Sequence, residues 1–213
     1  MKNKNDKLKG LYVVTDRPMC LERSMSVDKI VALAIGGGAR IIQYRNKQSP
    51  HAVRLYEAEQ LAKLCRKLDA ILLINDDIDI AIEVGADGVH LGQQDTSLAE
   101  ARSRLRQDKI IGITCHNDIE LARQAQAGGA DYVAFGRFFP SISKPSAPAA
   151  SVDTLRQANQ ELSIPICAIG GITLNNAPEL IKNGADMLAV VNAVFGAWKV
   201  TQAAKAFTQL FNT

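Results

Sequence analysis

The sequence predicts an α/β protein that folds as one closed (β/α)8 barrel, the TIM-barrel fold. Short apolar runs alternate with amphipathic segments along the chain, which is typical of parallel strands joined by helices. Polar clusters recur directly after those runs, and barrels of this type collect their chemistry at that end of the strands. The 213 residues are 47% hydrophobic, enough for one sizeable core. We therefore expect a single domain over 1–213, with a polar tail at 1–9.

Eight apolar runs are expected to form the strands, because each is short and apolar on both alternating positions. In order they are 11–15, 40–44, 71–75, 88–91, 110–114, 132–135, 165–169 and 187–191. Amphipathic patterns between and after them predict helices at 52–68, 98–105, 118–127, 152–162, 177–182 and 202–210. Eight units with no left-over block favour a closed barrel over an open doubly wound sheet.

A weak internal repeat marks the opposite end of the strands. Gly-Ala-Arg or Gly-Ala-Asp closes a helix and opens the next strand at 38–40, 85–87, 129–131 and 184–186. The glycine suits a helix C-terminus. We expect Asp87, Asp131 and Asp186 to serve structure rather than catalysis, since they precede the strands.

The composition of the chain limits the classes of binding partner and the cellular location that we expect. The net charge is +3 and no basic block stands out, so a nucleic-acid partner is not expected. No apolar run reaches membrane-spanning length, and no signal-peptide core follows the lysine-rich start. The four cysteines are widely spaced and form no CxxC pair, which predicts reduced thiols and a cytoplasmic protein.

The end of the second predicted strand carries a basic cluster. Gln43, Arg45 and Lys47 alternate, and period-two spacing directs all three to one side. A guanidinium and an ammonium beside an amide suit a polyanion such as a diphosphate. The alternative is an ordinary solvated strand exit.

Two carboxylates follow neighbouring strands. Asp76 comes after the third run and Asp95 after the fourth, so they should lie close together and bind Mg²⁺, which prefers oxygen ligands. Helix capping is the alternative for Asp76 or Asp77. Asp77 fits capping better, and we leave it out of the predicted metal site.

Later strand ends offer phosphate contacts. Ser141 and Ser143 provide hydroxyls and Lys144 provides an ammonium in a proline-rich loop. The alternative is that this loop is a plain surface turn. Gly170-Gly171 follows the seventh run, where barrels of this type often bind phosphate through backbone N–H groups. His116 is a possible acid or base, whereas His90 lies inside a strand and fits a packed core position. No Ser-His-Asp order or nucleophile elbow is present.

Together these motifs resemble the thiamine phosphate synthase family, in order from about Leu11 to Phe195. The matching segments are 11–16, 43–47, 75–77, 90–95, the Ser-Ile-Ser-Lys loop and 169–172. The resemblance implies a (β/α)8 barrel that joins 4-amino-2-methyl-5-(diphosphooxymethyl)pyrimidine to a thiazole phosphate. Diphosphate is released with the help of Mg²⁺.

The resemblance also assigns residues. It implies Mg²⁺ ligands at Asp76 and Asp95, and catalytic cations at Arg45, Lys47 and Lys144. Substrate contacts are implied at Gln43, Tyr44, Arg45, Asn46, Lys47, Asn75, Thr114, Ser141, Ile142, Ser143, Lys144, Gly171, Val191 and Asn192. Three features depart from the family pattern: Asn46 replaces a common acid, Asn192 a common serine, and Ser-Ile-Ser a Thr-x-Thr pattern.

The implied chemistry needs no nucleophilic side chain. A C–O bond to diphosphate beside an electron-rich pyrimidine breaks through a carbocation-like state, so stabilising the leaving group matters more than a strong base. Two alternatives stay open. A thiazole tautomerase-like isomerase would need neither a diphosphate clamp nor paired acids, and a non-catalytic phosphate-ligand sensor would need a recognition segment.

Overall fold

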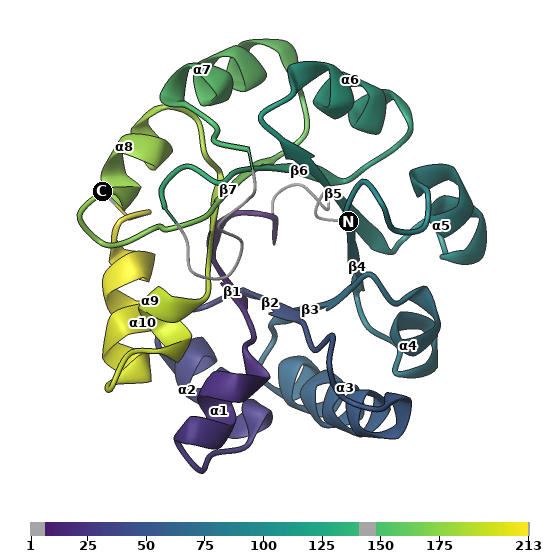
Figure 1. The fold of residues 1–213 in the computed structure, drawn as a ribbon, viewed down its shortest axis with the longest axis vertical. Helices are drawn as coiled ribbons and strands as arrows, with labels where there is room; N and C mark the ends of the chain where they lie inside the picture. Colours follow the sequence, from purple (N-terminus) through teal and green to yellow (C-terminus); the bar gives the residue numbers. More distant parts are fainter. Residues whose placement is uncertain (1–6, 141–147, 213) are drawn as a thin grey trace.

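A computed structural model describes residues 7–140 and 148–212 of the chain. Eight parallel strands pair in sequence order, and β8 pairs with β1 to close the barrel (Figure 1). The strands are β1 (Gly10–Val14), β2 (Ile41–Tyr44), β3 (Ile71–Asn75), β4 (Gly88–Leu91), β5 (Ile110–His116), β6 (Tyr132–Phe135), β7 (Ile166–Ile169) and β8 (Met187–Val190). The predicted fold is confirmed, and each predicted strand lies within two residues of its observed bounds.

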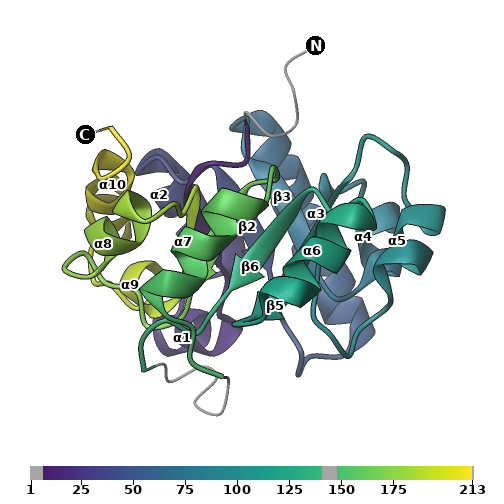
Figure 2. The same cartoon turned by 90° about the horizontal axis from the view of Figure 1, so that it is seen from above.

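Helices form a ring around the barrel (Figures 1 and 2). They are α1 (Arg17–Glu22), α2 (Val27–Gly36), α3 (His51–Lys67), α4 (Ile78–Glu83), α5 (Leu98–Arg104), α6 (Ile119–Ala127), α7 (Val152–Glu161), α8 (Ala177–Lys182), α9 (Asn192–Phe195) and α10 (Val200–Gln209). The six helices expected from periodicity are present. Helices α1 and α9 are too short for a periodic pattern, with six and four residues.

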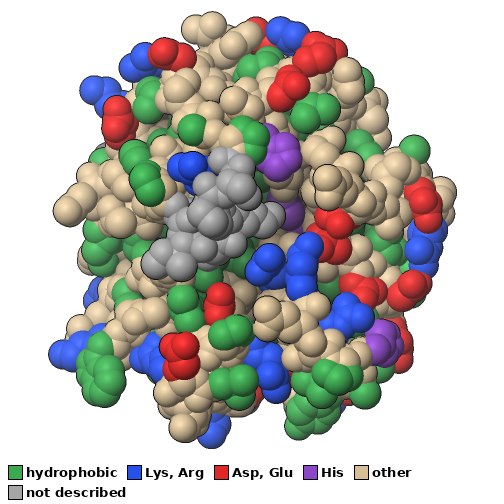
Figure 3. Space-filling model, viewed as in Figure 1, with side chains coloured by type: hydrophobic (Ala, Val, Ile, Leu, Met, Phe, Trp, Pro, Cys, Tyr) green, Lys and Arg blue, Asp and Glu red, His purple; other side chains and the backbone are tan. Residues whose placement is uncertain are grey.

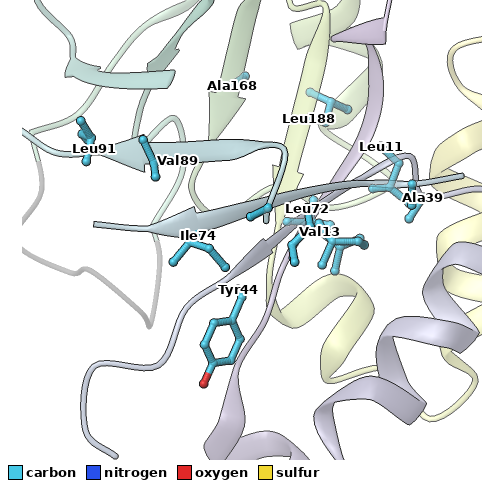
Figure 4. Close-up of a cluster of buried hydrophobic side chains, with 14 of the residues drawn as sticks. Leu11, Val13, Ala39, Tyr44, Leu72, Ile74, Val89, Leu91, Ala168 and Leu188 are labelled. Atoms are coloured by element: carbon cyan, nitrogen blue, oxygen red, sulfur yellow. The ribbon is translucent and has the colours of Figure 1, made fainter. Parts of the chain in front are cut away.

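The strands separate two cores. Their outer faces pack on the helices, and Figure 4 shows Val13, Ile74 and Leu188 among these side chains. A smaller cluster fills the barrel itself and includes Tyr12 and Tyr132. Burial on both faces explains why the strands read as continuous apolar runs.

The Gly-Ala-Asp repeat is structural, as predicted. Gly38, Gly85, Gly129 and Gly184 all have positive φ, between 64° and 104°, the left-handed conformation that ends a helix at low cost to glycine. The aspartates then tie neighbouring strands together. Asp87, Asp131 and Asp186 each accept a hydrogen bond of 2.8 Å from a backbone N–H at the start of β3, β5 and β7, respectively.

One residue of the predicted polar tail at 1–9 packs inside the barrel. Leu8 is fully buried and fills the bottom of the barrel interior with Ile41 and Met187. An apolar side chain at that position removes water from an otherwise open end of the barrel. The four cysteines are free thiols and all are buried, as expected. No helix in the described ranges is long and apolar enough to cross a membrane.

The bottom-face role of Asp131 is testable. Its carboxylate accepts from the Ile111 N–H and pairs with Arg102 at 2.7 Å. Asp131→Ala should lower the free energy of unfolding by about 1–3 kcal/mol, because it leaves a buried N–H without an acceptor. The kcat/KM of the folded enzyme should stay unchanged. Denaturant unfolding measures the loss, with the exposed Asp153→Ala as a control; a catalytic defect with normal stability would contradict the assignment.

Candidate active site

The predicted polar clusters meet at the carboxyl ends of the strands. Figure 3 views this face and shows basic and acidic side chains adjoining one another near the ends of β2, β3 and β4. A polar hollow of about 500 Å³ lies beside them; Lys47, Asn75 and Asp76 are among the residues that line it. Residues distant in sequence therefore share one rim, as the barrel requires.

The end of β2 is held by β1. The Thr15 hydroxyl accepts a hydrogen bond of 2.9 Å from the Arg45 backbone N–H, and the Thr15 N–H donates to the Gln43 carbonyl at 2.9 Å. Gln43 is 95% buried, pointing into the barrel, where its amide nitrogen donates to the Tyr12 hydroxyl at 2.5 Å. These contacts place Gln43 inside the barrel mouth and Arg45 at its rim.

The side chains of Tyr44 and Asn46, which are predicted to contact substrate, lie against helix α3. Tyr44 is buried on the outer side of β2, as Figure 4 shows, and its hydroxyl donates to Glu57 of α3 at 2.7 Å. The Asn46 amide donates to the same carboxylate at 3.0 Å, and Arg17 completes the cluster at 2.7 Å. An acid in place of Asn46 would face Glu57, so the amide at this position has a local electrostatic reason.

The two predicted metal-binding acids lie together. Asp76 pairs with Lys47 at 2.5 Å. Burial, followed by a hydrogen bond shared with Asp95, raises the pKa of the Asp76 carboxyl, and Lys47 opposes the rise. The Asp76 backbone is left-handed, with φ of 65°, and its N–H donates to the His90 carbonyl on β4. Asp95 is oriented by the Gly92 N–H, which donates to it at 2.7 Å.

This pair fits a divalent cation. Two carboxyls that share a hydrogen bond repel when both ionise, and a bound cation removes that repulsion. The described residues contain no group of three or more acidic, histidine or cysteine ligands. Mg²⁺ commonly takes one or two carboxylates and completes its shell with water and phosphate oxygens. Asp77 is not part of the pair, because it caps α4 through the Ile80 N–H, as expected.

The far side of the rim contributes Thr114, Gly171 and Asn192. Thr114 lies near the end of β5, and its hydroxyl is 2.8 Å from the ring of His90 on β4. Gly171 has φ of 64°, and a Cβ there would lie 2.4 Å from the Pro140 carbonyl oxygen, so the loop after β6 packs directly on it. Asn192 opens α9, next to Val191, and its buried side-chain oxygen has no hydrogen-bond partner among the described residues.

The predicted loop residues Ser141, Ile142, Ser143 and Lys144 lie outside the described residues. His116 ends β5 with φ of 53°, beside an irregularity in the β5–β6 pairing.

Three contributors were absent from the sequence-based site. Thr15 orients the β2 exit, Glu57 anchors Tyr44 and Asn46, and Arg137 packs against Gly170, where an added Cβ would lie 2.4 Å from the Arg137 Cβ. Only Thr15 carried a sequence signal, as the polar residue directly after the first apolar run. The roles of Glu57 and Arg137 depend on contacts between distant segments.

The fold and this rim define the class of protein: a (β/α)8-barrel enzyme with its polar site at the top of the strands. The thiamine monophosphate synthase family profile matches residues 11–194. A thiamine-phosphate synthase from Nitrosospira multiformis is 49% identical over 205 residues, covering 95% of this chain and 85% of that protein. The structure of a thiamine phosphate pyrophosphorylase from Pyrococcus furiosus aligns with a TM-score of 0.88 at 36% identity, covering 99% and 98% of the two chains.

The chain belongs to the thiamine monophosphate synthase family and is a transferase. More distant structures share the fold. A 3-hexulose-6-phosphate synthase aligns with a TM-score of 0.68 at 19% identity, covering 94% of this chain and 99% of the other.

The position of Tyr44 generates a prediction. Tyr44→Phe removes a hydroxyl that faces Glu57 on the outer side of β2, so kcat/KM should change less than about threefold. The free energy of unfolding should fall by about 1.5–3 kcal/mol, the net value of a hydrogen bond to a charged group. Steady-state kinetics and urea unfolding measure the two quantities. A large kinetic loss at normal stability would place the Tyr44 hydroxyl at the substrate instead.

Proposed function

We propose that this enzyme joins 4-amino-2-methyl-5-(diphosphooxymethyl)pyrimidine to a thiazole phosphate, forming thiamine phosphate and diphosphate. The observation that carries the proposal is the cluster of Lys47, Asp76 and Asp95 at the carboxyl ends of β2, β3 and β4. Cations next to a pair of carboxylates suit a diphosphate that arrives with a divalent metal ion. Family membership supports the same reaction.

The proposed roles follow position on the rim for the described residues, and the family resemblance for Ser141, Ile142, Ser143 and Lys144. Gln43 and Thr114 face the barrel mouth and would hold the pyrimidine, with Asn75 between them and the diphosphate. Arg45, Lys47 and Lys144 would bind the diphosphate. Gly171, Val191 and Asn192 would receive the thiazole phosphate through backbone N–H groups, with Ser141 and Ser143 near the thiazole and Ile142 between them.

The proposed reaction is a dissociative substitution. The C–O bond between the pyrimidine methylene and diphosphate breaks, and both electrons leave with the oxygen. Arg45, Lys47 and Lys144 stabilise the negative charge that develops on the leaving group. The thiazole nitrogen then forms the new C–N bond to the methylene carbon, and the site walls exclude competing water.

Asp76 and Asp95 would hold Mg²⁺, which supplies further positive charge to the diphosphate. The raised pKa of Asp76 gives the expected pH dependence. Cation binding requires ionised carboxylates, so the Mg²⁺ concentration for half-maximal activity should rise as pH falls toward that pKa.

The isomerase and sensor alternatives have less support. Neither explains a cation cluster set against paired carboxylates at the rim. The buried thiols of this biosynthetic enzyme also support our inference of a cytoplasmic location.

The decisive assay mixes the protein with both substrates and Mg²⁺ and measures diphosphate and thiamine phosphate. Both products should form in equal amounts, and chelation of the metal should stop the reaction. Isomerisation of the thiazole without diphosphate release would favour the isomerase, and ligand binding without turnover the sensor.

Removing either metal-binding acid tests the cation site. Asp76→Ala and Asp95→Ala should each lower kcat/KM by at least about 10²-fold, because the diphosphate loses its metal. The fold should persist, since both side chains lie on the rim rather than in the core. Asp108→Ala, an exposed acid far from the rim, serves as the control. Full Mg²⁺-dependent turnover in both rim variants would exclude this site.

Arg45 offers a second test. Arg45→Lys keeps the charge but loses the planar fork that contacts two phosphate oxygens. We expect a fall in kcat/KM of about tenfold or more, with unchanged thermal stability. Normal kinetics in the lysine variant would show that Arg45 acts only as a distant charge.

A further inference from the structure

A hydrogen-bond relay crosses the interior of the barrel beneath the site. The Gln43 amide nitrogen lies 2.5 Å from the Tyr12 hydroxyl, which lies 2.9 Å from the Tyr132 hydroxyl. Tyr132 lies 2.8 Å from His90 Nδ1, and His90 Nε2 lies 2.8 Å from the Thr114 hydroxyl. The five residues come from β2, β1, β6, β4 and β5, so the relay connects Gln43, inside the barrel mouth, to Thr114 through the core.

The surrounding structure accommodates this relay. Tyr12 and Tyr132 are almost fully buried, within an otherwise largely apolar interior. The Tyr132 ring stacks on His90, with centroids 5.6 Å apart, and meets the Tyr12 ring edge-on at 6.1 Å. Gly112 makes room for it, because a Cβ there would lie 2.0 Å from the Tyr132 ring. Glycine at position 112 of β5 therefore leaves the space that the Tyr132 ring occupies.

The orientation of the Gln43 amide, with its nitrogen toward Tyr12, sets the direction of every other bond in the relay by proton counting. Gln43 donates to Tyr12, so the Tyr12 proton goes to its other partner, the Tyr132 oxygen. Tyr132 must then donate to His90 Nδ1, which makes His90 neutral with its proton on Nε2. That proton is donated to the Thr114 oxygen. Burial raises the pKa of both tyrosines, so both keep the protons that the relay needs.

The two ends of the relay are therefore coupled. Thr114 accepts from His90, so its own hydroxyl proton is available to a ligand. Gln43 turns its nitrogen to Tyr12, so its carbonyl oxygen is its available acceptor. Reversing the Gln43 amide would reverse every bond and exchange these properties.

We propose that Tyr132 is a positioning residue that sets the polarity of Gln43 and Thr114 and thereby selects an aminopyrimidine. This inference rests on the proposed function, which brings the pyrimidine to these two residues. A 4-aminopyrimidine has an amino donor next to a ring-nitrogen acceptor, and the relay offers one acceptor and one donor. In a 4-oxopyrimidine the neighbouring groups are an acceptor and an N–H donor, so it needs the opposite polarity.

The first test needs no substrate. The chain has only three histidines, so ¹⁵N NMR can assign the ring nitrogens of His90. The free enzyme should hold His90 as the neutral tautomer protonated on Nε2. Tyr132→Phe removes the donor to Nδ1 and should give a mixture of tautomers. A wild-type His90 protonated on Nδ1, or an imidazolium at neutral pH, would overturn the inference whatever reaction the enzyme catalyses.

The second test compares kcat/KM for the 4-amino and 4-oxo pyrimidine diphosphates. Wild type should prefer the amino form by about 10²-fold or more, because the wrong polarity leaves buried groups unpaired. Tyr132→Phe and Tyr12→Phe should each reduce that preference by about tenfold or more. Cys167→Ala is the control, since it alters the same interior cluster without removing a member of the relay, and should keep the preference.

The outcomes separate the two hypotheses. No turnover of either compound by wild type would contradict the proposed function, while the NMR result still decides the polarity of the relay. Turnover by wild type, with the same preference in a folded Tyr132→Phe variant, would contradict the positioning role. If Tyr132→Phe does not fold, Tyr12→Phe decides the question, because it cuts the relay between Gln43 and Tyr132.

Discussion

Closure of the sheet between β8 and β1 is the constraint on which this structure depends. Every strand gains a partner on both sides, and all eight carboxyl ends meet at one rim. Aspartates at the opposite end accept hydrogen bonds from the neighbouring strands and help to hold their register. A slip by one residue would turn the inward Gln43 outward and bring Tyr44 into the barrel. The position of the site thus depends on the strand register, which the aspartates at the bottom of the barrel help to hold.

Electrostatics at the rim follows from that placement. Asp76 and Asp95 come from adjacent strands and are close enough to share a hydrogen bond, while Lys47 partly balances them. In this arrangement a divalent cation would favour a polyanion, and the polyanion would favour the cation, because each reduces the repulsion that the other meets. The same logic accounts for Asn46, whose amide donates to Glu57 where a carboxylate would be repelled.

The barrel interior combines two opposing requirements. Apolar side chains such as Leu8 and Met187 close its lower end, where burial away from water is favourable. Higher up, buried hydroxyls and an imidazole are tolerated only because each finds a partner. A satisfied polar network of this kind has fewer arrangements than an apolar core, and it can transmit orientation from one wall to another.

Much of the protein was predictable from sequence. The alternation of apolar runs and helical patterns determined the barrel, because strand burial on two faces leaves a direct compositional trace. The polar clusters after those runs located the rim, including Asp76 and Asp95, and the glycine repeat located the bottom. Local chemistry also separated Asp77, which caps α4, from its neighbour. These features depend on neighbouring residues in the chain.

Tertiary structure decided everything that depends on distance between segments. The direction of Tyr44 toward Glu57, the packing of Arg137 on Gly170 and the burial of Leu8 all depend on partners from remote elements. Tyr12, Tyr132 and His90 each read as ordinary strand residues, since periodicity assigns a face but not a contact. Only when the barrel closes do their side chains meet and form a connected path, because a hydrogen bond depends on position in space rather than on order in the sequence.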